Sequence, residues 1–98
     1  MTKNIEFEKL NLETSQIAWK ELQRFFAGGY AIYVAGDLDL VEVAYQMSMD
    51  NKNQIEQWMK EGHVGKVTDN HAREWLEADA DVWAVVVSPW VLVQKGGD

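Results

Sequence analysis

The sequence predicts a small α+β domain in which about four helices pack on one small β-sheet. Apolar residues recur at helical spacing in several segments, and the C-terminal part contains a run of β-branched and aromatic residues. With 98 residues, the chain is long enough for one two-layer core. We therefore expect a single domain over residues 1–98, with a flexible N-terminal segment over 1–10 and a tail over 95–98.

The first predicted elements are a helix and a strand separated by two glycines. Apolar side chains at positions 18, 19, 22, 25 and 26 form one stripe, which predicts a helix from about Leu12 to Ala27. Gly28 and Gly29 end this helix, because glycine readily adopts the left-handed conformation found at helix ends. The aromatic and β-branched residues of Tyr30–Ala35 then predict a strand.

Two further helices are predicted between Asp39 and Gly62. Asp39 is suited to the N-cap of the first helix, and Glu42 three residues later completes a variant of the capping box. Asn53 and Glu56 repeat this signature at the start of the second helix. The apolar residues after each cap lie on one helical face and are expected to point toward the core.

A short segment and a fourth helix follow. His63–Val67 is expected to be an edge strand or an irregular link between helices. Thr68 is a good N-cap for the next helix, and Asp69 lies favourably near the positive end of that helix.

The run Val82–Val93 is the most informative segment, because ten of its twelve residues are apolar. A strand with one wet face would alternate apolar and polar residues, so both faces of this run are suited to burial. A turn around Pro89 would fold Val82–Val87 against Val91–Lys95 as a hairpin. The alternative is one long strand bent at Pro89, at an edge or a bulge, because proline cannot donate to the ladder.

Trp83 and Trp90 are the residues expected to mark a binding surface. They are seven positions apart, so in an unbroken strand they would point to opposite faces of the sheet. Because the helices of so short a chain are expected to cover one face, one of the two indoles should face a pocket or a partner. The alternative is a core role beneath the chain's own helices.

The net charge of -7 arises entirely in the middle of the chain. Residues 37–81 contain eleven acids and four bases. This balance disfavours nucleic acid and anionic membranes as partners, because both require a basic surface. No apolar stretch approaches the ~18 residues needed to span a bilayer. The absence of cysteine and of an N-terminal apolar h-region leads us to expect a cytoplasmic protein.

Asp37, Asp39 and Glu42 form the candidate metal site. Carboxylates beside a helix start can supply the oxygen ligands that hard divalent cations prefer. The structural alternative is that Asp39 and Glu42 cap the helix while Asp37 lies in the turn. No motif supplies a nucleophile, a base and an oxyanion donor together, so we predict no catalytic residue and no cofactor.

Several segments together resemble a known family. They are Glu13–Gly29, Leu38–Ala44, Ala72–Leu76 and, most specifically, Trp83–Gln94 with its pattern Trp-Ala-Val-Val-Val-x-Pro-Trp-Val. This combination resembles a bacterial family of small uncharacterised proteins, the domain of unknown function 2288. The resemblance implies a bacterial, stand-alone, single-domain protein and no activity or catalytic residue. His71 departs from the glutamine or glutamate expected as the capping-box partner of its helix.

Three functional hypotheses follow. The favoured one is an interaction or self-associating module that uses the C-terminal Trp/Val-rich strands, because covering both faces of a sheet normally requires a larger domain. The second is a small-ligand binder in which Trp83 or Trp90 lines an apolar pocket. The third, and least supported, is a divalent-metal-dependent enzyme that uses Asp37, Asp39 and Glu42.

Overall fold

The computed structural model describes residues 13–95 and confirms the α+β class. Along the chain the elements are β1 (Ser15–Ala18), the 3-10 helix η1 (Trp19–Leu22), α2 (Gln23–Ala27), β2 (Ala31–Val34), α3 (Leu40–Ser48), α4 (Lys52–Lys60), β3 (Val64–Lys66), α5 (Asp69–Glu77), β4 (Asp81–Val87) and β5 (Trp90–Lys95). Lys95 belongs to β5 and not to a tail. The predicted end segment 1–10 and residues 96–98 lie outside the described residues.

The five strands form one mixed sheet in the order β1-β4-β5-β2-β3. β4 and β5 are an antiparallel hairpin in which Val87 pairs with Trp90, and β1 pairs antiparallel with β4. β5 pairs parallel with β2, and β3 closes the other edge antiparallel to β2. The hairpin alternative for the C-terminal run is therefore confirmed, and His63–Val67 contains an edge strand.

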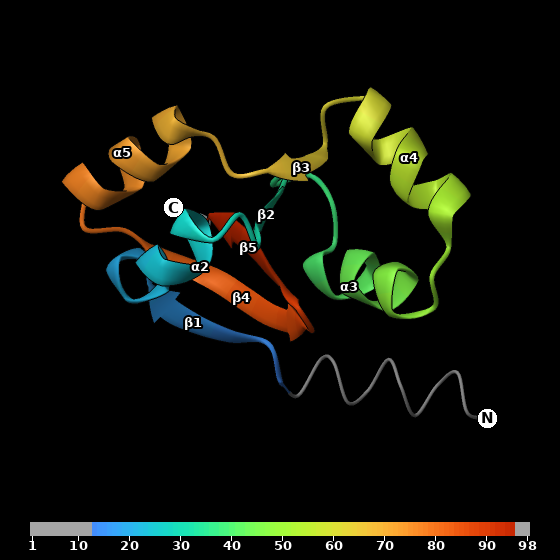
Figure 1. Ribbon diagram of the computed structural model, residues 1–98, viewed down its shortest axis with the longest axis horizontal. Coiled ribbons are helices and arrows are strands. Elements are labelled where there is room, and N and C mark those ends of the chain that lie inside the picture. The colour runs from blue at the N-terminus through green and yellow to red at the C-terminus, as the bar shows by residue number, and fades with distance from the viewer. Residues whose placement is uncertain (1–12, 96–98) are drawn as a thin grey trace.

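Helices cover both faces of this sheet, with α3 and α4 on one side and α2 and α5 on the other (Figure 1). The α3 face holds a core that includes Val43, Val85 and Leu92. The opposite face holds a second core around Trp19 and Trp75. The expectation that helices cover only one face of the sheet was wrong. The helices have only four to nine residues each, so a chain of this length contains enough of them to cover both faces.

The predicted helix over 12–27 is wrong in its first half. Residues 15–18 form β1, and the helical part begins only at Trp19, as η1 followed by α2. β1 lies along the edge of β4, and the backbone N–H of Trp19 donates to the carbonyl of Ala80 at 2.9 Å. This pairing with a distant strand overrides the helical spacing of the nearby apolar residues.

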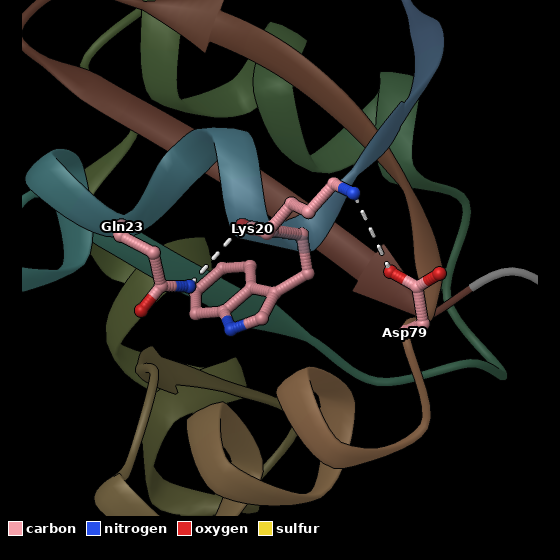
Figure 2. A network of polar contacts seen from close by, with 4 residues as sticks. Lys20, Gln23 and Asp79 are labelled. Carbon is pink, nitrogen blue, oxygen red and sulfur yellow. Dashed lines mark hydrogen bonds and ion pairs between the residues drawn. The ribbon is translucent and has the colours of Figure 1, made fainter.

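Polar contacts surround η1 near the turn between α5 and β4 (Figure 2). The side-chain amide of Gln23 donates to the carbonyl oxygen of Trp19 at 3.3 Å. The Lys20 Nζ atom lies 4.0 Å from the Asp79 Oδ1 atom, and both side chains are largely exposed. Such an exposed ion pair contributes less than about 1 kcal/mol. The aromatic core beneath η1, and not this ion pair, therefore holds η1 in place.

Side chains of the predicted type cap α3 and α4. The Asp39 carboxylate accepts from the backbone N–H of Val41 at 3.0 Å, as predicted. Asn51 caps α4 by accepting from the N–H of Gln54 at 3.4 Å, so the cap predicted at Asn53 is wrong by two residues. Both positions hold asparagine, and the tight turn after α3 brings the earlier one into the capping position.

The capping box of α5 contains a histidine. The Thr68 Oγ1 atom accepts from the His71 N–H at 3.1 Å, and the His71 Nδ1 atom accepts from the Thr68 N–H at 3.5 Å. His71 thus takes the role expected of glutamine or glutamate. Its ring also stacks on Tyr33, with centroids 4.4 Å apart, and on Trp75 at 5.4 Å. This one side chain therefore joins the start of α5 to the sheet.

Replacing Thr68 with alanine is expected to lower the free energy of unfolding by about 1 kcal/mol. The variant removes the acceptor for the His71 N–H in the first turn of α5. Urea denaturation of both proteins measures the difference. Thr68→Ser keeps the hydroxyl and should retain most of the stability, so equal losses in the two variants would contradict a capping role.

Candidate functional site

Trp83 and Trp90 lie on the same face of the sheet. Trp83 pairs with Gln94 across the hairpin, and Val87 pairs with Trp90. Cross-strand partners share a face, so both indoles belong to the side covered by α3. The expectation that they mark opposite faces was wrong. It assumed one unbroken strand, whereas the two-residue turn places Trp90 directly opposite Val87, on the same face as Trp83.

The two indoles have different surroundings. Trp90 is half-buried, packs against the core on the α3 face, and lies with its ring centroid 5.9 Å from that of Tyr30. Trp83 lies nearer the β1 edge, is 40% exposed, and has Gln16 and Gln94 as its strand neighbours. Trp90 is therefore part of an apolar wall, whereas Trp83 lies on a largely polar strip.

Trp90 lines a cleft of about 270 Å³ between the hairpin turn and the corner that joins α3 to α4. The apolar lining side chains are half-buried, and the polar ones are exposed. The lining residues are Met47, Asp50, Asn51, Lys52, Ile55, Glu56, Val87, Ser88 and Trp90. We call this the Trp90 cleft; it has an apolar interior and a charged rim.

The corner between α3 and α4 forms one wall of the Trp90 cleft. Asp50 adopts a left-handed conformation with φ 57°, which turns the chain sharply after α3. Asn51 then holds the corner with both ends of its side chain, because its oxygen caps α4 and its Nδ2 atom donates to the Gln46 Oε1 atom at 2.7 Å. This turn brings Met47 of α3 and Ile55 of α4 into the same cleft.

The rim of the Trp90 cleft carries unpaired charge. Within residues 13–95, the side chains of Asp50, Lys52 and Glu56 form no hydrogen bond or ion pair. The lining thus contains two carboxylates and one ammonium group. It therefore has one more acid than base, within a chain whose net charge is -7.

The three acids of the candidate metal site have structural partners or lie apart. Asp39 caps α3, and the Glu42 Oε2 atom accepts from the Gln46 Nε2 atom at 2.6 Å. Asp37 is exposed in the loop before α3. In the part of the chain that the structure describes, no group of three or more histidine, aspartate or glutamate side chains is placed to hold a metal ion. The metal site stays a prediction from sequence.

Gln94 is an important residue that sequence reasoning missed. Its side-chain amide donates to the carbonyl oxygens of Ala35 and Leu38, both at 2.7 Å. These bonds fasten the loop before α3, which carries Asp37, to the strand beside Trp83. The available signal was its position as the first polar residue after the apolar part of β5.

Comparison with known proteins gives a family and a fold. A family model described as "Protein of unknown function (DUF2288)" matches residues 6–95. The NMR solution structure of PA1075 from Pseudomonas aeruginosa is similar, with a TM-score of 0.84 and 39% sequence identity, over 99% of this chain and 87% of that one. No curated protein matches the chain. The family resemblance seen in the sequence is thus confirmed.

No helix in the described range is a candidate membrane span. None of the helices within residues 13–95 is both long and apolar enough to cross a bilayer.

Proposed function

The chain belongs to the DUF2288 family, whose function is unknown, and we propose that it is a protein-binding module. The observation that carries this proposal is the Trp90 cleft, which opens between the C-terminal hairpin and the corner of α3 and α4. In this role the cleft receives an apolar side chain of a partner. The C-terminal strands contribute Val87 and Trp90 to the contact.

The chemistry of the cleft supports a protein side chain as its occupant. Met47, Ile55 and Trp90 offer apolar surface that water would leave on binding, and tryptophan is enriched among residues that dominate binding energy. Pockets for small molecules usually enclose roughly 300–1,000 Å³. The Trp90 cleft, at about 270 Å³, is near the lower end of that range and has room for one or two side chains of a partner.

The partner is either another protein or a second copy of this chain. Light scattering over a range of concentrations separates these cases, because self-association through the cleft would raise the mass of the pure protein. We place the module in the cytoplasm, a location with which the cysteine-free sequence is compatible.

The cleft can be probed with single capped amino acids that imitate a partner's side chain. N-acetyl-phenylalanine amide and N-acetyl-leucine amide are expected to shift the NMR signals of the Trp90 indole and of Ile55. N-acetyl-serine amide should leave the same signals unchanged. Shifts spread over the whole surface, or absent from these two residues, would contradict the proposal.

Ile55→Gln is expected to weaken the binding of N-acetyl-phenylalanine amide about fivefold, because it removes apolar surface from the cleft wall. Met59→Gln is the matched control. It introduces the same residue on the same helix, at a side chain that is 53% exposed and outside the cleft lining. The control should change the affinity less than about twofold. Equal effects of the two variants would argue against the cleft as the binding site.

A further inference from the structure

We infer that the segment occupying the Trp90 cleft is a basic peptide segment, in which lysine or arginine flanks a large apolar side chain. This inference rests on the proposed function and specifies the chemistry of the partner. It follows from the charged side chains around the cleft, with which an apolar group alone would not pair.

The two rim carboxylates are free to bind a cation. Asp50 comes from the turn after α3 and Glu56 from the middle of α4, and both line the same cleft. Neither side chain has a hydrogen bond or ion pair with a residue in the range 13–95. By contrast, Asp39 and Glu42 nearby in the sequence are engaged with Val41 and Gln46. The two acids of the cleft lining are therefore available to pair with a cation.

The wider surface strengthens the same preference. The lining has one more acid than base, and the chain as a whole has a net charge of -7. A negative surface of this kind attracts a basic segment and repels an acidic one before contact. Lys52, also on the rim, opposes a cation locally, and its effect can be tested separately.

The apolar interior of the Trp90 cleft sets a second requirement for the peptide segment that binds there. Met47, Ile55, Val87 and Trp90 are half-buried, whereas the carboxylates of the same lining are exposed. A purely basic segment would leave this apolar surface in contact with water. A segment with an apolar centre and basic flanks fills the interior and pairs with the rim at the same time.

Three synthetic peptides test the inference directly. They share the centre Leu-Phe-Leu and are flanked on each side by two lysines, two serines or two glutamates. Titrations followed through the Trp90 indole and Ile55 NMR signals are expected to give the tightest binding for the lysine peptide, at least about tenfold tighter than for the glutamate peptide. Added sodium chloride should reduce this difference.

The double variant Asp50→Asn/Glu56→Gln is expected to weaken binding of the lysine peptide about fivefold and to leave the serine peptide within about twofold. Asparagine tolerates the left-handed backbone at position 50, so the turn should persist. Glu74→Gln/Glu77→Gln is the matched control, since it removes two exposed acids from α5 on the other face of the sheet. Lys52→Gln should tighten binding of the lysine peptide.

The outcomes separate the inference from the proposed function. If all three peptides bind at the cleft with equal affinity, the basic partner is wrong and the binding module stands. If none of the peptides shifts the cleft signals, the proposed function fails as well. If the two double variants weaken the lysine peptide equally, its attraction is to the overall charge, and the inference is overturned.

Discussion

Trp19→Ala is expected to destabilise the domain by about 4 kcal/mol. The Trp19 side chain is completely buried, and its Nε1 atom donates to the carbonyl of Ala72 at 3.2 Å. Its ring makes edge contacts with Trp75 and Phe26, at centroid distances of 5.1 and 5.9 Å. Removing it opens a cavity where η1, α2 and α5 meet. Small domains have a free energy of unfolding of about 5–15 kcal/mol, so urea denaturation should show a large loss.

Two further variants keep this result interpretable if Trp19→Ala does not fold. Trp19→Phe retains an aromatic ring and loses the N–H donor, so its cost should be about 1–2 kcal/mol. Trp83→Ala removes the same side chain from a position that is 40% exposed, and about 1 kcal/mol is expected. Similar losses for Trp19→Ala and Trp83→Ala would contradict the central place of Trp19 in the second core.

Gln94→Met is expected to cost about 2 kcal/mol, because it removes both donors to the loop before α3. Methionine preserves the approximate length and shape of the side chain, so the carbonyls of Ala35 and Leu38 lose their partner with little change in packing. The amides from Ala35 to Asp39 should exchange with solvent faster than in the parent protein. Denaturation and hydrogen exchange measure the two effects.

Gln57→Met is the control for this substitution. The Gln57 amide donates to the Glu61 Oε2 atom at 2.8 Å on the exposed surface of α4. Water replaces that bond readily, so a change within about 0.5 kcal/mol is expected. If the two glutamine variants behave alike, the bonds made by Gln94 do not secure the loop.

The sequence predicted those elements whose signals are local. The strand at residues 30–35 and the caps at Asp39 and Thr68 depend on short stretches, and each is present. β1 was missed because its four residues become a strand only when the edge of β4 is beside them. The N-cap of α4 was misplaced for a related reason, since Asn51 and Asn53 are chemically the same and the turn selects between them.

The candidate site was predicted in part. The apolar run predicted a binding surface at Trp83 or Trp90 without choosing between them, and the structure places Trp90 in the lining of a cleft. The opposite wall comes from Met47 and Ile55, which lie far from Trp90 in the sequence, and no local pattern joins these segments. Whether Trp83 and Trp90 lie on the same face of the sheet also depended on the hairpin. In an unbroken strand a separation of seven residues places them on opposite faces, whereas the two-residue turn places them on the same face.

The parallel pairing of β2 with β5 sets an order on folding during synthesis. Ala31 pairs with Val91, so β2 leaves the ribosome long before its central partner is made. At ~5–20 residues per second, this delay is roughly 3–12 s. Until β5 emerges, β2 has a free edge. The core on the α3 face then lacks Leu92, and the core around Trp19 lacks Val93. A nascent chain of this protein is thus open to mispairing at β2 until β5 is made, and a chaperone would have most to protect in that interval.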